Sequence, residues 1–440
     1  MSGARTFFDL PLELREQVYK DVLASPHQGP DILRSCREIL NEAHKFLYQR
    51  PISLGSQEAL CDWSIRIPSD LLLNVSEIAL HVQDVNLKPI LDSQSSERSH
   101  LSPRLLTWEL YEQEVHRIEQ ALKRLPKIKI ITLRALPCRP SFLYREFVTQ
   151  VLNVLSTSCP ELVDLRLEAN FHHQDLRFLP SLANLRAFSF DGFSLSSPAA
   201  TAKILASLPH LSSLSVISER TFPIPNAESP SDYNSSRQSF TGDVARTLKH
   251  LASFSVTERI PAASSTMFFT RDLFISLRNH KTLASLTVNL SHGPGTEILQ
   301  SLGEFLESTL IERLELDWPD LHAGIVEQYQ ILCASLKVLW IRARSQVYAS
   351  SILSSVADSL DKKDMFSLAK VVLLRSKKEA RDQIGDGKDG GTGSAKFEAC
   401  DDKLSTHDGD NIEFCRARQR VREMNIHVAW CTHACQLEIR

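Results

Sequence analysis

The sequence predicts an α/β solenoid, a stack of strand and helix repeats with parallel strands, preceded by a short helical bundle. Three observations predict this fold class. A short apolar motif recurs along most of the chain, helical patterns alternate with its copies, and the first fifty residues hold two helical patterns of a different kind. One strand and one helix cannot bury their apolar faces alone, so repeats at this spacing indicate stacking.

The most complete copy of the motif has apolar residues at Leu162, Leu165 and Leu167 and an asparagine at Asn170. It follows the leucine-rich-repeat pattern L-x-x-L-x-L-x-x-N. Nine further copies keep the three apolar positions, at Val75/Ile78/Leu80, Ile128/Ile131/Leu133, Leu185/Phe188/Phe190, Leu211/Leu214/Val216, Leu251/Phe254/Val256, Leu283/Leu286/Val288, Ile311/Leu314/Leu316, Leu336/Leu339/Ile341 and Leu368/Val371/Leu373. The motif therefore predicts parallel strands on the concave face of an irregular leucine-rich-repeat horseshoe.

Helical patterns fill the spaces between the motif copies. Apolar residues recur every three or four positions in residues 109–125, 142–155, 199–208, 269–277, 297–306, 325–332 and 352–360. Pro126, Pro160 and Pro209 each stand two residues before the first apolar position of a strand, where proline ends a helix and favours extended chain. Helix and strand therefore alternate along the repeats.

Charge and composition favour a protein partner. The 440 residues include 50 Lys and Arg and 53 Asp and Glu, and this balance gives no general attraction to nucleic acid or to anionic membranes. The first thirty residues lack the apolar core of a secretory signal, and no apolar run is long enough for a membrane helix. We expect an intracellular protein, cytoplasmic or nuclear, whose nine cysteines are reduced thiols.

The amino-terminal bundle is predicted from two helices. The first has Asp9 as its cap, Pro11 in its first turn, and an apolar stripe at Leu14, Val18 and Val22 that we expect to be buried. The second begins at Asp31, and its apolar residues continue to Leu47 at spacings of three or four. A bundle of this size is marginally stable without a neighbouring domain or a partner.

The residues Leu10-Pro11-x-Glu13-Leu14, with Val18 and Val22, are followed by Ser35-Cys36-Arg37 and by residues 47–54, and together they resemble the F-box, especially its fungal versions. The pattern Cys-Pro-x-Leu at residues 159–162 also resembles the cysteine-containing repeats of F-box proteins. The resemblance implies docking onto the adaptor subunit of an SCF-type ubiquitin ligase, and through it to a cullin. The implied contact residues are Leu10, Pro11, Leu14, Val18 and Val22.

The leading functional hypothesis is a substrate-recognition subunit of such a ligase. The bundle would hold the adaptor, the repeats would hold a protein substrate, and the chain itself would catalyse nothing. Two other interpretations stay open. The bundle could be a helical cap that seals the first repeat, in a scaffold without a ubiquitin role, or the chain could belong to a related fungal F-box-like family of unknown role.

The expected domains are an F-box-like bundle in residues 1–54, a solenoid in 55–376, a polar linker in 377–411 and a cap in 412–440. Residues 221–240, rich in proline, serine and asparagine, should loop out of one repeat, and residues 377–406 are too polar to pack. Residues 412–424 look helical, and residues 426–431 suit a final strand or cap.

Motifs for cofactors and metals receive little support. Gly385-x-Gly387-x-x-Gly390 matches a dinucleotide fingerprint in letters only, because no strand precedes it and no helix follows. Cys431, His433 and Cys435 alternate and could hold zinc, which makes a metal-dependent carboxy-terminal activity a distant third hypothesis. We expect no cofactor and no metal.

The protein substrate is expected on the concave strand face. Side chains that flank the apolar motif positions point away from the core, because strand side chains alternate. We expect the ligand to contact Arg313, Glu315, Trp340 and Arg342, with Trp340 exposed, since tryptophan and arginine are common binding hot spots. The alternative is that the segment from Ile412 onward folds back and covers Trp340.

Overall fold

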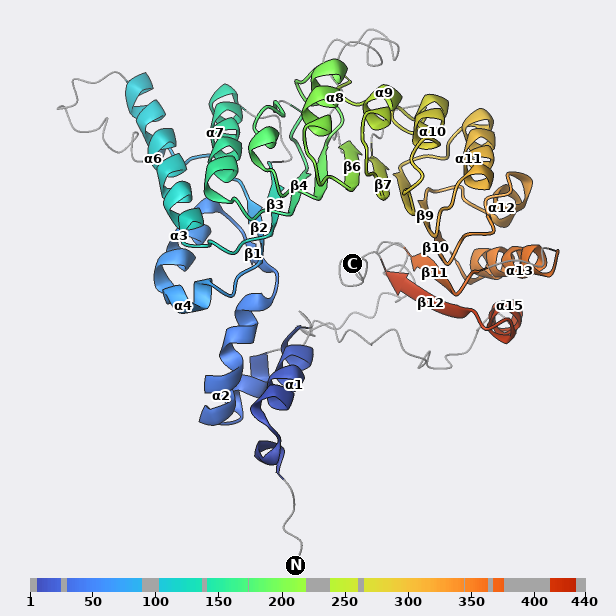
Figure 1. Ribbon diagram of the computed structural model, residues 1–440, viewed down its shortest axis with the longest axis horizontal. Helices are drawn as coiled ribbons and strands as arrows, with labels where there is room; N and C mark the ends of the chain where they lie inside the picture. The colour runs from blue at the N-terminus through green and yellow to red at the C-terminus, as the bar shows by residue number, and fades with distance from the viewer. Residues whose placement is uncertain are drawn as a thin grey trace, which may run out of the picture. The chain divides into compact units, whose positions relative to one another are not determined.

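The computed structural model describes residues 6–24, 30–88, 103–136, 141–172, 174–218, 238–259, 265–343, 345–362, 367–375 and 412–432. The chain forms two compact units. The first comprises Met1–Ser196 with Ile204–Leu211, and the second comprises Ser197–Lys203 with Ser212–Arg440. Figure 1 shows the elements of both units.

The amino-terminal bundle contains η1 (Phe7–Asp9), α1 (Leu12–Ala24), η2 (Pro30–Arg34), α2 (Arg37–Ala43) and η3 (His44–Gln49). The expectation of one continuous helix from Asp31 to Leu47 is wrong. Cys36 is extended, with φ of −158°, and its Sγ accepts a hydrogen bond from the Ile39 amide at 3.5 Å, so a new helix begins after it. Asp9 does not cap α1 either, because its carboxylate accepts from the Thr6 amide at 2.6 Å and closes η1.

The remaining elements of the first unit are strands that alternate with helices. They are β1 (Ile52–Leu54), α3 (Gln57–Arg66), α4 (Ser69–Leu72), β2 (Glu77–His81), α6 (Pro103–Lys123), β3 (Ile130–Arg134), α7 (Phe142–Ser158), β4 (Asp164–Glu168), η4 (Leu179–Ser181) and β5 (Ala187–Asp191). Neighbouring strands are parallel and follow the order of the sequence. Equivalent motif residues are in register, with Ile131 opposite Leu165 and Leu133 opposite Leu167.

The second unit repeats this arrangement after α8 (Pro198–Ala206), the helix in which the two units divide. Its elements are β6 (Ser213–Ser218), α9 (Gly242–Arg246), β7 (Ser253–Glu258), α10 (Arg271–Leu277), β8 (Ser285–Leu290), α11 (Thr296–Ser308), β9 (Arg313–Asp317), α12 (Ala323–Gln328), β10 (Val338–Arg342), α13 (Gln346–Lys362), β11 (Lys370–Arg375), α15 (Ile412–Glu423) and β12 (His427–Thr432). All seven strands, β6 to β12, are parallel and in sequence order.

The motif residues build the core between strands and helices. Every apolar position in the ten motif copies is at most 7% exposed, with Leu368 the most accessible. The ten predicted strands are confirmed as β2 to β11, and the expected final strand at residues 426–431 is confirmed as β12. The fold is therefore an α/β solenoid of leucine-rich-repeat type, and β1 is a further strand that the motif did not predict.

A buried carboxylate fastens the chain after β7. Glu258 is 2% exposed and accepts hydrogen bonds from three consecutive backbone amides, those of Met267, Phe268 and Phe269, each at 2.8 Å. Burial raises the pKa of the Glu258 carboxyl, and the three amide donors oppose that rise. These hydrogen bonds attach residues 267–269, which lead into α10, to the end of β7.

The last repeat is completed by α15 and β12, which follow β11 along the fold. Arg420 on α15 bridges Asp358 at 2.7 Å and Asp361 at 2.5 Å on α13. β12 pairs with β11 in parallel register, with Leu373 opposite Trp430. The expected insertion at residues 221–240 lies almost wholly outside the described residues, and the expected polar segment at 377–406 lies entirely outside them.

Candidate protein-binding surfaces

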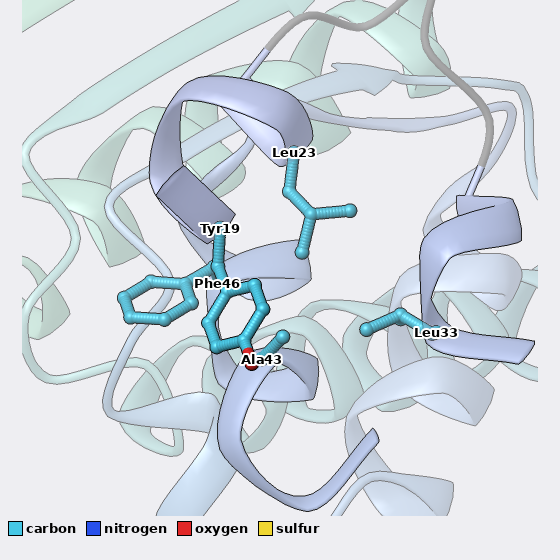
Figure 2. Close-up of a cluster of buried hydrophobic side chains, with 5 residues drawn as sticks. All are labelled: Tyr19, Leu23, Leu33, Ala43 and Phe46. Atoms are coloured by element: carbon cyan, nitrogen blue, oxygen red, sulfur yellow. The ribbon is translucent and has the colours of Figure 1, made fainter. Parts of the chain in front are cut away.

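The core of the amino-terminal bundle fixes the orientation of α1. Its buried side chains come from four elements and are drawn in Figure 2: Tyr19, Leu23, Leu33, Ala43 and Phe46. Phe7 packs against this cluster, with its ring centroid 5.6 Å from that of Tyr19 in an edge-to-face arrangement. Because Tyr19 and Leu23 point inward, the residues one position earlier, Val18 and Val22, are rotated by about 100° from the core.

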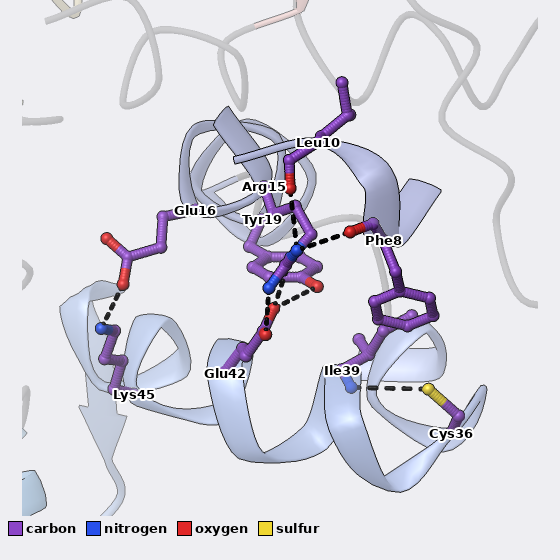
Figure 3. Close-up of polar contacts among 9 residues, drawn as sticks. All are labelled: Phe8, Leu10, Arg15, Glu16, Tyr19, Cys36, Ile39, Glu42 and Lys45. Atoms are coloured by element: carbon purple, nitrogen blue, oxygen red, sulfur yellow. Dashed lines mark hydrogen bonds and ion pairs between the residues drawn. The ribbon is translucent and has the colours of Figure 1, made fainter. Parts of the chain in front are cut away.

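A polar network fastens the start of α1 to α2 (Figure 3). Arg15 donates from Nε to Glu42 Oε2 at 3.0 Å and from a terminal nitrogen to Glu42 Oε1 at 2.6 Å. The Tyr19 hydroxyl donates to Glu42 Oε2 at 2.9 Å. Arg15 also donates to the carbonyl oxygens of Phe8 and Leu10, at 3.0 and 2.8 Å. One arginine therefore holds both α2 and the turn that carries Leu10 and Pro11.

Hydrogen bonds and burial shift the pKa values of the three side chains in this network. The hydrogen bond from Arg15 is the largest influence on Glu42 and holds the pKa of that carboxyl below its ordinary value. Burial is the main cause that raises the pKa of Tyr19 to about 12, and the bond to Glu42 adds to it. The hydrogen bond to Glu42 raises the pKa of Arg15. Near neutral pH the ion pair is charged and the tyrosine is a neutral donor.

The apolar residues that suggested an F-box form an exposed stripe on α1 and the turn before it. Leu10 is 39% exposed, Leu14 54% and Val18 38%, Pro11 is also exposed, and Val22 is half-buried. In Figure 3 the Leu10 side chain points away from Glu42. We call Leu10, Pro11, Leu14, Val18 and Val22 the α1 stripe. The expectation that Leu14 and Val18 lie buried in the bundle is wrong, because Tyr19 and Leu23 occupy the inward side of the helix.

The sequence did not single out Arg15, Tyr19 or Glu42, although these residues position the stripe. Their contacts join positions 23 and 27 residues apart, which no local period reveals. One signal was available: Tyr19 and Leu23 repeat the four-residue spacing of the stripe, shifted by one residue. With two adjacent apolar stripes on one helix, only one of them, here Tyr19 and Leu23, faces the core of the bundle.

The four residues predicted on the strand face lie on β9 and β10, as the motif requires. Glu315 is opposite Trp340 in the parallel register, and Arg342 forms an ion pair with Asp317 at 2.9 Å. Arg313 is exposed, whereas Glu315 is only 8% exposed. The expectation of an exposed tryptophan is wrong, because Trp340 is 7% exposed.

Trp340 belongs to a separate apolar cluster. Its buried neighbours are Val372 and Leu374 on β11, and Val338 and Ala429 pack against them. Trp340, Val372 and Ala429 are register partners, so they share the strand face opposite the motif residues. Ala429 lies on β12, in register with Val372, and packs against the cluster from the same strand face. We call these five residues the strand-face cluster.

The described residues contain no group of three or more His, Cys, Asp or Glu side chains that could hold a metal ion. The proposed zinc ligands His433 and Cys435, the side chain of Cys431 and the glycines at 385–390 lie outside the described part of the chain. No helix within the described ranges is both long enough and apolar enough to cross a membrane.

Comparison with known proteins gives no family. No family model matches the chain, and no curated protein matches it. Among solved structures, the Rad7 and Elc1 complex in yeast is similar at 11% identity and a TM-score of 0.39, over 82% of this chain and 89% of that one.

Two further solved structures are less similar. The TLR13–ssRNA13 complex matches at 12% identity and a TM-score of 0.27, over 77% of this chain and 41% of that one. The N6-methyl-AMP deaminase from Arabidopsis thaliana matches at 12% identity and a TM-score of 0.20, over 73% and 78%. At these scores the fold assignment rests on the strand order and register described above.

Proposed function

We propose that the chain is a substrate-recognition subunit of an SCF-type ubiquitin ligase. In this proposal the α1 stripe docks onto the adaptor subunit, and through it onto a cullin. The leucine-rich repeats bind the protein to be modified. The transfer chemistry resides in other subunits, so the chain itself is not an enzyme.

The observation that carries the proposal is the exposure of the α1 stripe on a well-fixed helix. Leu10, Leu14 and Val18 are each more than a third exposed, while their neighbours Tyr19 and Leu23 are fully buried. Burial of an aliphatic side chain contributes about 1.5–3 kcal/mol, so three of them are enough to anchor a protein interface. A helix that only capped the first repeat would have no reason to keep two apolar stripes.

Adaptor capture by the double variant Leu14→Asp with Val18→Asp tests this proposal. The purified chain is passed over immobilised adaptor subunit, and we expect the variant to lose at least 100-fold in affinity, because two carboxylates would be desolvated in the interface. Since both positions are exposed, the circular dichroism spectrum and melting temperature should stay unchanged.

Matched controls place an aspartate on exposed apolar positions of other helices. Ile65 on α3 is 70% exposed and Val347 on α13 is 60% exposed, so Ile65→Asp and Val347→Asp should retain full capture. Equal capture by the double variant and the controls would show that the stripe does not bind the adaptor. The second candidate, a repeat scaffold without a ubiquitin role, requires no adaptor binding at all.

A further inference from the structure

The strands of the first unit carry charged side chains on the face opposite the motif residues. In the parallel register, Glu77 on β2 is opposite Ile130 on β3, and Ile130 is opposite Asp164 on β4. All three residues are half-buried. Because strand side chains alternate, these three share the face that points away from the motif residues. An isoleucine is therefore flanked by a carboxyl-bearing side chain on each neighbouring strand.

The arginines of β3 and β4 are both paired with carboxylates on this face. Arg166 donates to Asp164 Oδ2 from Nε at 3.0 Å and from a terminal nitrogen at 2.5 Å. Arg134 donates from Nε to Glu168 Oε2 at 2.7 Å. Each guanidinium charge is thus balanced within the sheet, which makes the face a poor site for an anionic ligand.

Glu77 differs from Asp164 and Glu168, because no hydrogen bond or ion pair joins it to another residue within the described part of the chain. Burial raises the pKa of the Glu77 carboxyl above its ordinary value, and the charge of Arg166 opposes that rise. A half-buried carboxylate without a partner loses hydration and gains no hydrogen bond in return. A cation supplied from outside the chain would offset that loss.

A second polar group on the same face also lacks a partner. Ser189 on β5 is opposite Arg166 in the register and is 7% exposed. Its hydroxyl has no hydrogen-bond partner among the residues that the structure describes. Most buried hydroxyls in proteins are hydrogen-bonded. The Ser189 hydroxyl is therefore able to form one hydrogen bond with a ligand that lies on this face.

We propose that the strand face of β2 to β5 binds a lysine or arginine side chain of a protein partner, with the cation at Glu77 and the aliphatic stem on Ile130. Lysine and arginine combine a cation with an apolar stem, so they match a carboxylate beside an isoleucine. Ser189 forms a hydrogen bond with the partner's backbone. We call Glu77, Ile130 and Ser189 the cation site. The inference rests on the proposed function, because it assigns a residue class to the protein that the repeats bind.

Selection from a library of random heptapeptides displayed on phage tests the inference on the full chain. We expect peptides bound to the natural chain to be enriched in lysine and arginine relative to the unselected library. Glu77→Gln should abolish this enrichment. Glu161→Gln removes the same charge at an exposed position of the same unit, so it is the matched control and should retain the enrichment.

A selected peptide then measures the contribution of the cation. It is synthesised once with its lysine or arginine and once with norleucine at that position, which keeps an apolar stem without the charge. The norleucine peptide should bind the natural chain about tenfold more weakly, because it loses a hydrogen bond between charged groups. The two peptides should bind the Glu77→Gln chain equally.

Three results of the selection would overturn the assignment. They are equal enrichment on the Glu77→Gln and Glu161→Gln chains, enrichment of acidic peptides, and no enrichment on the natural chain. Thermal denaturation gives a further readout, since Glu77→Gln should keep or raise the melting temperature when the natural carboxylate has no partner in the fold. A lower melting temperature would show a structural role for Glu77 and would also overturn the assignment.

Adaptor capture separates this inference from the proposed function. The Glu77→Gln chain should bind the immobilised adaptor subunit as the natural chain does. The Leu14→Asp with Val18→Asp chain should still select lysine and arginine peptides, because its substitutions lie on α1. Loss of peptide selection and loss of adaptor capture are therefore independent results.

Discussion

Arg15 and Glu42, which are 27 residues apart, are joined by two hydrogen bonds of 3.0 and 2.6 Å that connect α1 to α2. The same arginine binds the Phe8 and Leu10 carbonyls. The position of the α1 stripe therefore depends on an ion pair made by Arg15, the residue next to Leu14 on the helix. The protonation of Glu42 is the simplest way to perturb it.

Acidification should loosen the bundle. Because the hydrogen bond from Arg15 lowers the pKa of Glu42 in the folded chain, the ionised carboxylate stabilises the bundle at all pH values above the ordinary carboxyl value of 4.5. This contribution is lost as the pH falls through the lowered folded-state pKa. Hydrogen exchange of α1 amides, corrected for the intrinsic pH dependence of exchange, should show constant protection above pH 4.5 and a decline below it.

Glu42→Gln supplies the control for this titration. The glutamine has no charge to lose, so α1 should be less protected at neutral pH and should lack the Glu42-dependent part of the acid decline. If the natural chain and the variant decline in the same way, other carboxylates govern the acid response of the bundle.

Trp340→Ala should destabilise the second unit. The side chain is buried against Val372 and Leu374, so its removal leaves a cavity and should reduce the free energy of unfolding by about 3–5 kcal/mol. Chemical denaturation measures this loss. Val347→Ala, at a position 60% exposed, should change stability by no more than about 0.5 kcal/mol. Equal stability of the two variants would place Trp340 on an open surface.

Gly303→Ala should also destabilise the second unit, for a steric reason. A Cβ at residue 303 would lie 2.1 Å from the Tyr329 carbonyl oxygen, at the junction between α11 and the end of α12. Relief requires a backbone shift between two helices, and we expect a loss of about 1–3 kcal/mol or more in chemical denaturation. Gly55→Ala is the matched control, because a Cβ there meets nothing within 4 Å. A fully stable Gly303→Ala chain would contradict the close helix contact.

Glu258→Gln should weaken the connection between β7 and α10. The carboxylate accepts from three backbone amides, whereas an amide side chain has one oxygen acceptor and would direct N–H donors at the third. A buried donor left unsatisfied costs about 1–3 kcal/mol, which thermal denaturation can measure. Glu307→Gln, on the exposed side of α11, should leave the melting temperature unchanged.

The strands could be predicted from the sequence because the apolar positions of the motif are the strand residues that are buried in the core. Leu165 and Leu167, for example, are buried as the motif requires, and the same holds in every copy. The bundle was harder, because the inward side of α1 is decided by the distant Glu42 and by Cys36, which interrupts the second predicted helix. The local spacing of apolar residues predicts neither the contact of α1 with Glu42 nor the helix start after Cys36.

The exposure of the strand face opposite the motif residues also could not be predicted from the sequence. Alternation correctly put Trp340 opposite the motif residues, but it assumes that this face meets solvent. Val372 and Leu374 are nevertheless at most 1% exposed, a burial that strand alternation does not encode. The role of Arg313, Glu315 and Arg342 in binding a protein remains a prediction.

The strand order of the second unit has a consequence for how the protein folds. Each strand from β7 to β11 pairs with the strands directly before and after it in the sequence. Contacts between neighbours close short loops, so this topology gives a low contact order and permits folding to start at any repeat and spread. A damaged end repeat can then fray and re-form against its neighbour while the rest of the array stays native.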